Sequence, residues 1–71
     1  MKVKLSYLDC FDSQYENIDY KIYQFVNPIT FDVINGVNLD LKVKLIPYDI
    51  YLCIIERKGK KWRVTSVEKI D

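Results

Sequence analysis

Residues 37–45 alternate apolar and polar side chains without exception, and they follow an Asn-Gly dipeptide at positions 35 and 36. Alternation with a period of two is typical of a β-strand that has one face in a core and the other in water. In a helix, the same side chains would be spread around the whole axis. The pattern therefore predicts a half-buried strand over residues 37–46 and a chain built largely of strands.

An Asn-Gly pair before such a strand is typical of a tight β-hairpin, whose first strand we expect over residues 29–34. A two-residue loop would pair Ile34 with Val37. A three-residue loop with Gly36 at positive φ pairs Val33 with Val37 instead and turns more apolar residues toward the core. Burial therefore favours the three-residue loop. The apolar face expected from it comprises Ile29, Phe31, Val33, Val37, Leu39 and Leu41.

Three further segments are expected to be strands. Residues 2–8 alternate apolar side chains with charged or polar ones, which is the pattern of a first half-buried strand. Residues 49–57 and 61–69 are rich in β-branched and aromatic side chains and flank a glycine at position 59, so they predict a second hairpin. Pro47, which cannot donate a backbone hydrogen bond, is expected to end the strand before it.

Residues 13–26 fit two patterns. Ser13 and Glu16 match the capping box of a helix, and apolar residues follow them at helical spacing. Other apolar residues in the same stretch alternate with charged neighbours, and the abundance of Tyr and Ile favours a strand. The residues alone leave both alternatives open.

The 71 residues are enough for one small domain, 1–71, and a chain of this size buries only about 60% of the surface that it exposes when unfolded. The predicted fold class is mainly all-β: five or six mostly antiparallel strands in a curved sheet or small barrel. The alternative is an α+β domain in which residues 13–26 form a helix packed on the sheet. Because the chain shows no secretory signal and no apolar run of the ~20 residues that cross a bilayer, we expect a cytoplasmic protein.

Composition bears on provenance and on partners. The chain lacks Ala and His, and Ile and Lys supply nine residues each, a usage favoured by AT-rich codons. We therefore expect a low-GC host, or a phage or mobile element living in one. The net charge of +1 divides unevenly, because residues 1–40 hold three basic and six acidic side chains, whereas residues 41–71 hold eight basic and four acidic ones. This basic excess is small for a dedicated nucleic-acid-binding protein.

No pattern in the chain predicts catalysis. The side chain most often used for general acid–base chemistry, His, is absent, and there is no glycine-rich phosphate loop. Cys10 and Cys53 form no C-x-x-C pair, and without His no common zinc set can be assembled. We expect free thiols, no metal or cofactor, and a protein that is not an enzyme.

Two sets of residues are candidate binding sites. The strand 49–57 is apolar on both faces, so its second face needs a cover, which is either a docked helix or another protein. The candidate protein interface there comprises Tyr23, Phe25, Tyr51 and Ile55. The hairpin 57–63 concentrates cations around a Trp, which suits phosphates and a stacked base, although such cations also serve simply to keep a hairpin tip soluble. This second set comprises Arg57, Lys58, Lys60, Lys61, Trp62 and Arg63.

The leading interpretation is a non-catalytic protein-binding module, of the kind that a phage or mobile element uses as a small inhibitor or adaptor. The first alternative is a small nucleic-acid-binding barrel that uses the basic hairpin 57–63. The second alternative is a subunit of a homo-oligomeric assembly. These classes differ in measurable ways. Salt-dependent retention on DNA or RNA would favour the nucleic-acid-binding barrel, and self-association in sedimentation would favour the homo-oligomer.

Overall fold

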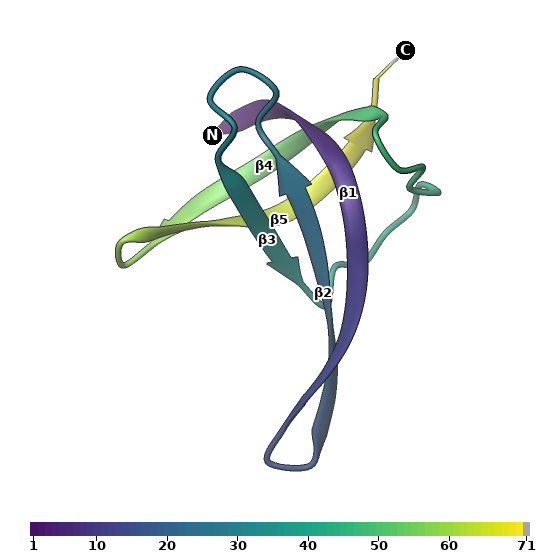
Figure 1. Ribbon diagram of the computed structural model, residues 1–71, viewed down its shortest axis with the longest axis vertical. Helices are drawn as coiled ribbons and strands as arrows, with labels where there is room; N and C mark the ends of the chain where they lie inside the picture. The colour runs from purple at the N-terminus through teal and green to yellow at the C-terminus, as the bar shows by residue number, and fades with distance from the viewer. Residues whose placement is uncertain (71) are drawn as a thin grey trace.

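The computed structural model describes residues 1–70, which form five β-strands and no helix, so nothing in this part of the chain is a helical membrane span. The strands are β1 (Lys2–Tyr15), β2 (Ile18–Val26), β3 (Val33–Val37), β4 (Ile50–Lys58) and β5 (Lys61–Lys69). They close into a ring in the order β1-β2-β3-β5-β4, with β1 also paired to β4 (Figure 1). Every pair is antiparallel except β3 and β5, which run parallel. The predicted fold class, a small and mainly antiparallel β-barrel, is confirmed.

The ambiguous segment 13–26 is strand and not helix. Tyr15 pairs with Ile18 across a turn formed by Glu16 and Asn17, whose φ angles are 49° and 65°. A two-residue turn with positive φ at both positions matches the right-handed twist of the strands that flank it. The α+β alternative is therefore wrong.

The barrel interior is filled by large apolar side chains. The rings of Tyr7 and Phe25 lie 5.5 Å apart and are tilted by 57°, an arrangement that aromatic pairs favour. Phe25 has no exposed surface, and neither do Leu5, Cys53 and Val64. The buried core comprises Leu5, Tyr7, Phe25, Ile34, Tyr51, Cys53, Ile55 and Val64.

The face of β4 that we expected to meet a partner lies inside the barrel. Tyr51 is 4% exposed, Ile55 is 3% exposed and Phe25 is completely buried, while Tyr23 is half-buried beside the core. Tyr51 pairs with Leu5 of β1 and so shares its inward face. The expectation of an outer surface is wrong for Phe25, Tyr51 and Ile55, because a strand that is apolar on both faces does not indicate which face is inside.

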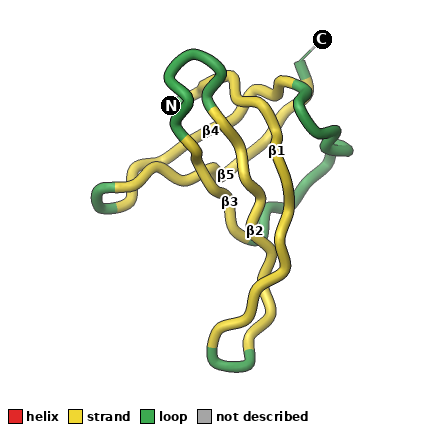
Figure 2. Tube along the Cα trace, viewed as in Figure 1, coloured by secondary structure: helices red, strands yellow, loops and turns green. Residues whose placement is uncertain are grey.

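The alternating segment 37–46 is not a strand. Only Val37 belongs to β3, and residues 38–49 form an irregular crossing segment between β3 and β4 (Figure 2). Burial nevertheless alternates along it, because an extended chain packed with one side against a barrel has the same period as a strand. The crossing segment forms no ladder with any strand of the ring, although β5 pairs with β3 at Arg63 alone. Its half-buried residues are Leu39, Leu41, Val43 and Leu45.

The expected hairpin at Asn35-Gly36 is also wrong, because both residues lie inside β3, and Val37 pairs with β2. Gly36 is not among the residues with positive φ. It is required for space instead, since a Cβ atom there would lie 2.8 Å from Leu39 Cδ1 and 3.0 Å from the carbonyl oxygen of Val64. Neither of the two hairpin registers is present.

Residues 27–32 form a turn and not the expected strand. The side-chain Oδ1 of Asn27 accepts hydrogen bonds from the backbone N–H of Ile29 at 2.9 Å and of Thr30 at 3.2 Å. Local bonds from an Asn side chain compete with strand pairing. Ile29 is 85% exposed and Phe31 is 77% exposed, so the expectation that they face the core is wrong.

Two hairpins extend beyond the ring in different directions (Figure 1). The outer part of the β1–β2 hairpin pairs only with itself, because β1 pairs with β4 over residues 2–6 and β2 pairs with β3 over residues 22–26. We call residues 9–21 the arm. The second projection is the predicted β4–β5 hairpin, which is confirmed and turns at Gly59 with a φ of 65°. We call residues 57–63 the basic hairpin.

Candidate functional site: a basic groove beside β3

Trp62 lies in the basic hairpin, outside the barrel core. Its side chain is 39% exposed, and the guanidinium carbon of Arg57 lies over its ring at 5.7 Å from the centroid. The Nε of Arg57 also donates a hydrogen bond to the carbonyl oxygen of Gly59 at 3.3 Å, which helps to hold the guanidinium in place. The indole is therefore a partly open ring with a cation stacked against it.

The basic hairpin and β3 enclose a groove of about 640 Å³, which we call the basic groove. Its β3 wall carries Val33, Asn35 and Val37, and the two walls meet where Asn35 aligns with Arg63 in parallel register. The groove therefore joins residues that are distant in the sequence. The cations that line it are Lys58, Lys60, Lys61 and Arg63.

Within residues 1–70, no ion pair involves the cations of the basic groove, although Glu56 stands directly opposite Arg63 in the β4–β5 pairing. Among residues 1–70 the one ion pair joins Lys21 to Asp12 at 4.0 Å, in the arm. Asp32 is the one carboxylate among the described residues that line the groove. A concave surface with four cations and one acid has a positive potential that attracts anions.

The six residues of the predicted hairpin set lie together, and five of them line the groove, while Arg57 stacks on Trp62. The β3 wall was not predicted, because Asn35 was expected in a turn. Val33, Asn35 and Val37 on the outer face alternate with two buried residues between them. This alternation over five residues is the signal that would have predicted a strand through the Asn-Gly pair.

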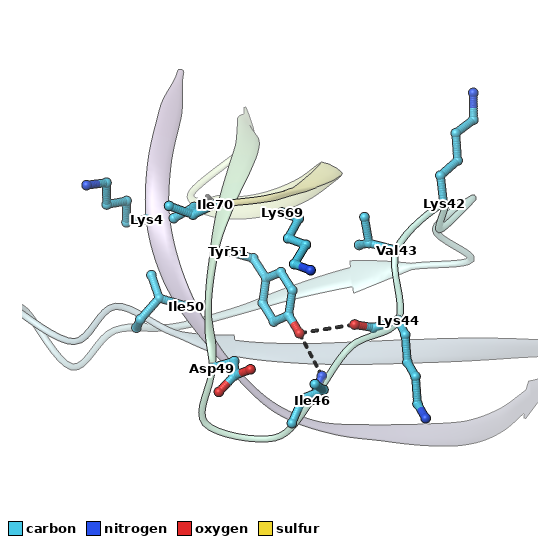
Figure 3. Close-up of a pocket in the computed structure, with 10 residues that line it drawn as sticks. All are labelled: Lys4, Lys42, Val43, Lys44, Ile46, Asp49, Ile50, Tyr51, Lys69 and Ile70. Atoms are coloured by element: carbon cyan, nitrogen blue, oxygen red, sulfur yellow. Dashed lines mark hydrogen bonds between the residues drawn. The ribbon is translucent and has the colours of Figure 1, made fainter.

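A second hollow of about 820 Å³ lies between the crossing segment and β4 (Figure 3). Tyr51 anchors the crossing segment there, since its hydroxyl accepts from the backbone N–H of Ile46 at 2.8 Å and donates to the carbonyl oxygen of Lys44 at 3.1 Å. The ammonium groups of Lys4, Lys42 and Lys44 point away from one another (Figure 3). This hollow is also lined by four lysines, the fourth being Lys69, and by one acid, Asp49. Only the basic groove adds a partly open aromatic ring, that of Trp62, which makes it the better candidate site.

The ionisable groups with displaced pKa values lie away from the groove. Burial raises the pKa of the Cys53 thiol to about 12, so this thiol stays protonated and acts as a small apolar core residue. Burial, and then the nearby Cys10 and Asp9, also raise the pKa of Tyr7. Cys10 is a half-buried free thiol near the base of the arm. Neither thiol contributes to the basic groove.

Comparison with known proteins adds no assignment. No model of a known protein family matches the chain, and no curated protein sequence matches it. Within residues 1–70, no three His, Cys, Asp or Glu side chains lie together in a group that could hold a metal ion. The interpretation of the site therefore rests on its geometry and charge.

Proposed function

We propose that this protein is a non-catalytic module that binds single-stranded nucleic acid in the basic groove. The observation that carries the proposal is the partly open indole of Trp62 in a groove with four cations. Nucleic acid is the common ligand that uses both, because its phosphates bind Lys and Arg while its bases stack on flat aromatic rings.

A single strand suits this groove better than a duplex. In a duplex the faces of the bases are covered by their neighbours in the stack, and only the base edges are accessible. The ring of Trp62 can therefore stack only on an unpaired base. With Arg57 over one face of the indole, the opposite face is the one left for the base.

The topology supports the proposal by analogy. The ring order β1-β2-β3-β5-β4, with β3 parallel to β5, resembles that of the OB-fold, a five-stranded barrel whose second and third strands and two loops hold oligonucleotides. The basic groove lies between the third strand and the β4–β5 hairpin. Because fold alone does not carry function, the proposal rests on the chemistry of the groove.

The protein-binding interpretation has less support. Three of the four side chains on which it depends, Phe25, Tyr51 and Ile55, are enclosed in the core. A partner would have to unfold the barrel to reach them. The basic hairpin, in contrast, keeps its cations exposed or half-exposed.

The fluorescence of Trp62, the only tryptophan in the chain, reports on binding directly. We expect quenching by a dT oligonucleotide of about ten nucleotides, a length within the range that one such barrel holds. The logarithm of the binding constant should fall linearly with the logarithm of salt concentration, with a slope of about −0.7 for each phosphate contacted.

A matched pair of variants separates a site from general attraction. Lys60→Glu/Lys61→Glu reverses two groove cations and should weaken binding by about tenfold or more. Lys42→Glu/Lys44→Glu makes the same change in the crossing segment and should bind as the unaltered protein does. No quenching at low salt, or equal loss in both variants, would contradict the proposal.

A further inference from the structure

The arm is an amphipathic ribbon with an exposed apolar face. Residues opposite one another in an antiparallel pair share a face, and Tyr15 lies opposite Ile18 near the tip. Both are 67% exposed, and Phe11 on the same face is 44% exposed. Within the arm this apolar face comprises Phe11, Tyr15, Ile18 and Tyr20, with one polar residue, Ser13, opposite Tyr20.

The arm has little support from the rest of the protein. Lys21 donates its backbone N–H to Asn38 Oδ1 at 2.9 Å, and its carbonyl oxygen accepts from the Asn38 N–H at 2.9 Å. Beyond this contact the ribbon is two-stranded, and isolated two-stranded ribbons are at best marginally stable in water. A surface docked on the apolar face would stabilise the arm.

The charges of the arm indicate which surface that is. Residues 9–21 hold four acids and one lysine, a net charge of −3, while the basic hairpin holds five cations and no acid, a net charge of +5. The arm therefore repels anionic surfaces and attracts a basic one. Asp12 and Asp19 lie on the reverse face of the ribbon, so they attract cations without losing their hydration when the apolar face docks.

We propose that the arm of one molecule docks in the basic groove of a second copy, with its apolar face against Trp62 and the β3 wall. The arm and the basic hairpin leave the barrel in different directions (Figure 1). In the proposed dimer a two-fold axis relates the two copies, and each arm occupies the groove of the other. The contact is then made twice, as in other isologous dimers.

The docked arm brings aromatic rings and a net negative charge to the groove, and nucleic acid brings bases and phosphates. The two ligands therefore compete for one groove, and this competition rests on the proposed function. A dT oligonucleotide should convert the dimer into monomers with bound oligonucleotide.

Sedimentation velocity over a range of protein concentrations tests the dimer. We expect a concentration-dependent dimer at low salt that dissociates as salt is added, because charge attraction is screened. Tyr15→Ser/Ile18→Ser should give monomers at every concentration. Ile29→Ser/Phe31→Ser removes two other exposed apolar side chains and should leave the dimer unchanged.

Charge exchange provides a test that does not depend on loss of function. Lys60→Glu/Lys61→Glu and Asp12→Lys/Asp19→Lys should each be monomeric alone, and mixing them should restore a dimer, because both contacts then join opposite charges. Circular dichroism checks that each variant is folded.

The outcomes separate this inference from the proposed function. Monomers only, or a dimer that survives Tyr15→Ser/Ile18→Ser, would overturn the arm interface even if the groove binds nucleic acid. A dimer that keeps its mass with oligonucleotide bound would overturn the competition. A dimer that binds no oligonucleotide would support the interface and contradict the proposed function.

Discussion

The arm and the basic hairpin project from one barrel, and each has an unfavourable feature of a different kind. The arm exposes aromatic and aliphatic side chains such as Tyr15 and Ile18 to water. The basic hairpin places Lys58 directly opposite Lys61, and like charges at opposed positions destabilise a ribbon. Contact with an apolar surface would remove the side chains of the arm from water. A bound anion would reduce the repulsion between the two lysines. These two features motivate the binding roles that we propose for the projections, while the buried core lies in the ring between them.

The largest effect on stability should come from the strand that joins the two regions. β3 pairs with β2, which leads from the arm into the barrel, and with β5, which leads from the basic hairpin into the barrel. Gly36→Val places a Cβ atom 2.8 Å from Leu39 Cδ1 and 3.0 Å from the Val64 carbonyl oxygen. Overpacking typically costs about 1–3 kcal/mol, and we expect the upper end because one neighbour is backbone. Urea denaturation measures the loss.

Gly59→Val is the control for that substitution, because a Cβ atom at Gly59 meets nothing within 4 Å but the φ angle is +65°. Its cost should reflect left-handed strain alone, about 1–2 kcal/mol. A Gly36→Val variant as stable as the unaltered protein would show that β3 does not pack as described.

The next prediction concerns the pH dependence of stability, which depends on the buried thiol of Cys53 in the barrel core. Because burial raises the pKa of Cys53 from 9.0 to about 12, the folded protein keeps a proton that the unfolded chain releases. The contribution of Cys53 to stability is therefore fully present below pH 9.0 and is lost as pH rises through the window from 9.0 to about 12. The urea concentration at the midpoint of unfolding should therefore decrease as pH rises through this window. The decrease should be smaller in Cys53→Val.

A thiol reagent provides an independent check at lower pH. In the folded protein Cys10 should react and Cys53 should not, since Cys53 has no exposed surface. Both should react in urea. Equal reactivity of the two thiols in the folded protein would contradict the burial of Cys53.

A smaller loss of stability, confined to the arm, is expected when the hydrogen bond between Lys21 and Asn38 is removed. Asn38→Ala removes the side-chain acceptor for the Lys21 N–H, which should cost about 0.5–1.5 kcal/mol. Amide hydrogen exchange should become faster across residues 18–21 and stay unchanged in β4 and β5. Faster exchange throughout the barrel would show that the arm is not an independent unit.

The smallest effect is expected in the basic hairpin itself. Replacing Lys58, Lys60 or Lys61 by Ser should change stability by at most about 0.5 kcal/mol each, because these side chains are exposed. Arg57→Ser should cost the most of such changes, since only Arg57 stacks on Trp62. Thermal denaturation compares the four variants. A loss well beyond this range would give the lysines a structural role and weaken the binding interpretation.

There are physical reasons why some elements could be predicted from the sequence and others could not. The β4–β5 hairpin was predictable because its two strands and its Gly59 turn are adjacent in the sequence. The segment 37–46 was not, because alternation reports an extended chain with one side buried and does not reveal whether a hydrogen-bonding neighbour exists. The Asn35-Gly36 pair misled for a related reason, since the partner of β3 is β2 and the space around Gly36 is set by Val64.

The candidate site was predictable in part. Its cations and Trp62 are contiguous in the chain, so composition alone indicated them. Its β3 wall lies more than twenty residues earlier in the chain and enters the site only through the parallel pairing of Asn35 with Arg63. The arm has a visible alternation around Tyr20, but its apolar face also depends on which residues of β1 stand opposite, and that register is a property of the fold.

Two-dimensional amide NMR of the protein titrated with a dT oligonucleotide tests most directly where nucleic acid binds. We predict shift changes in residues 33–37 and 58–63 and at the indole N–H of Trp62. Residues 42–44 and 46, which line the second hollow, should remain unchanged. Changes concentrated around that hollow, or no changes at low salt with excess oligonucleotide, would contradict the assignment of the basic groove as the binding site.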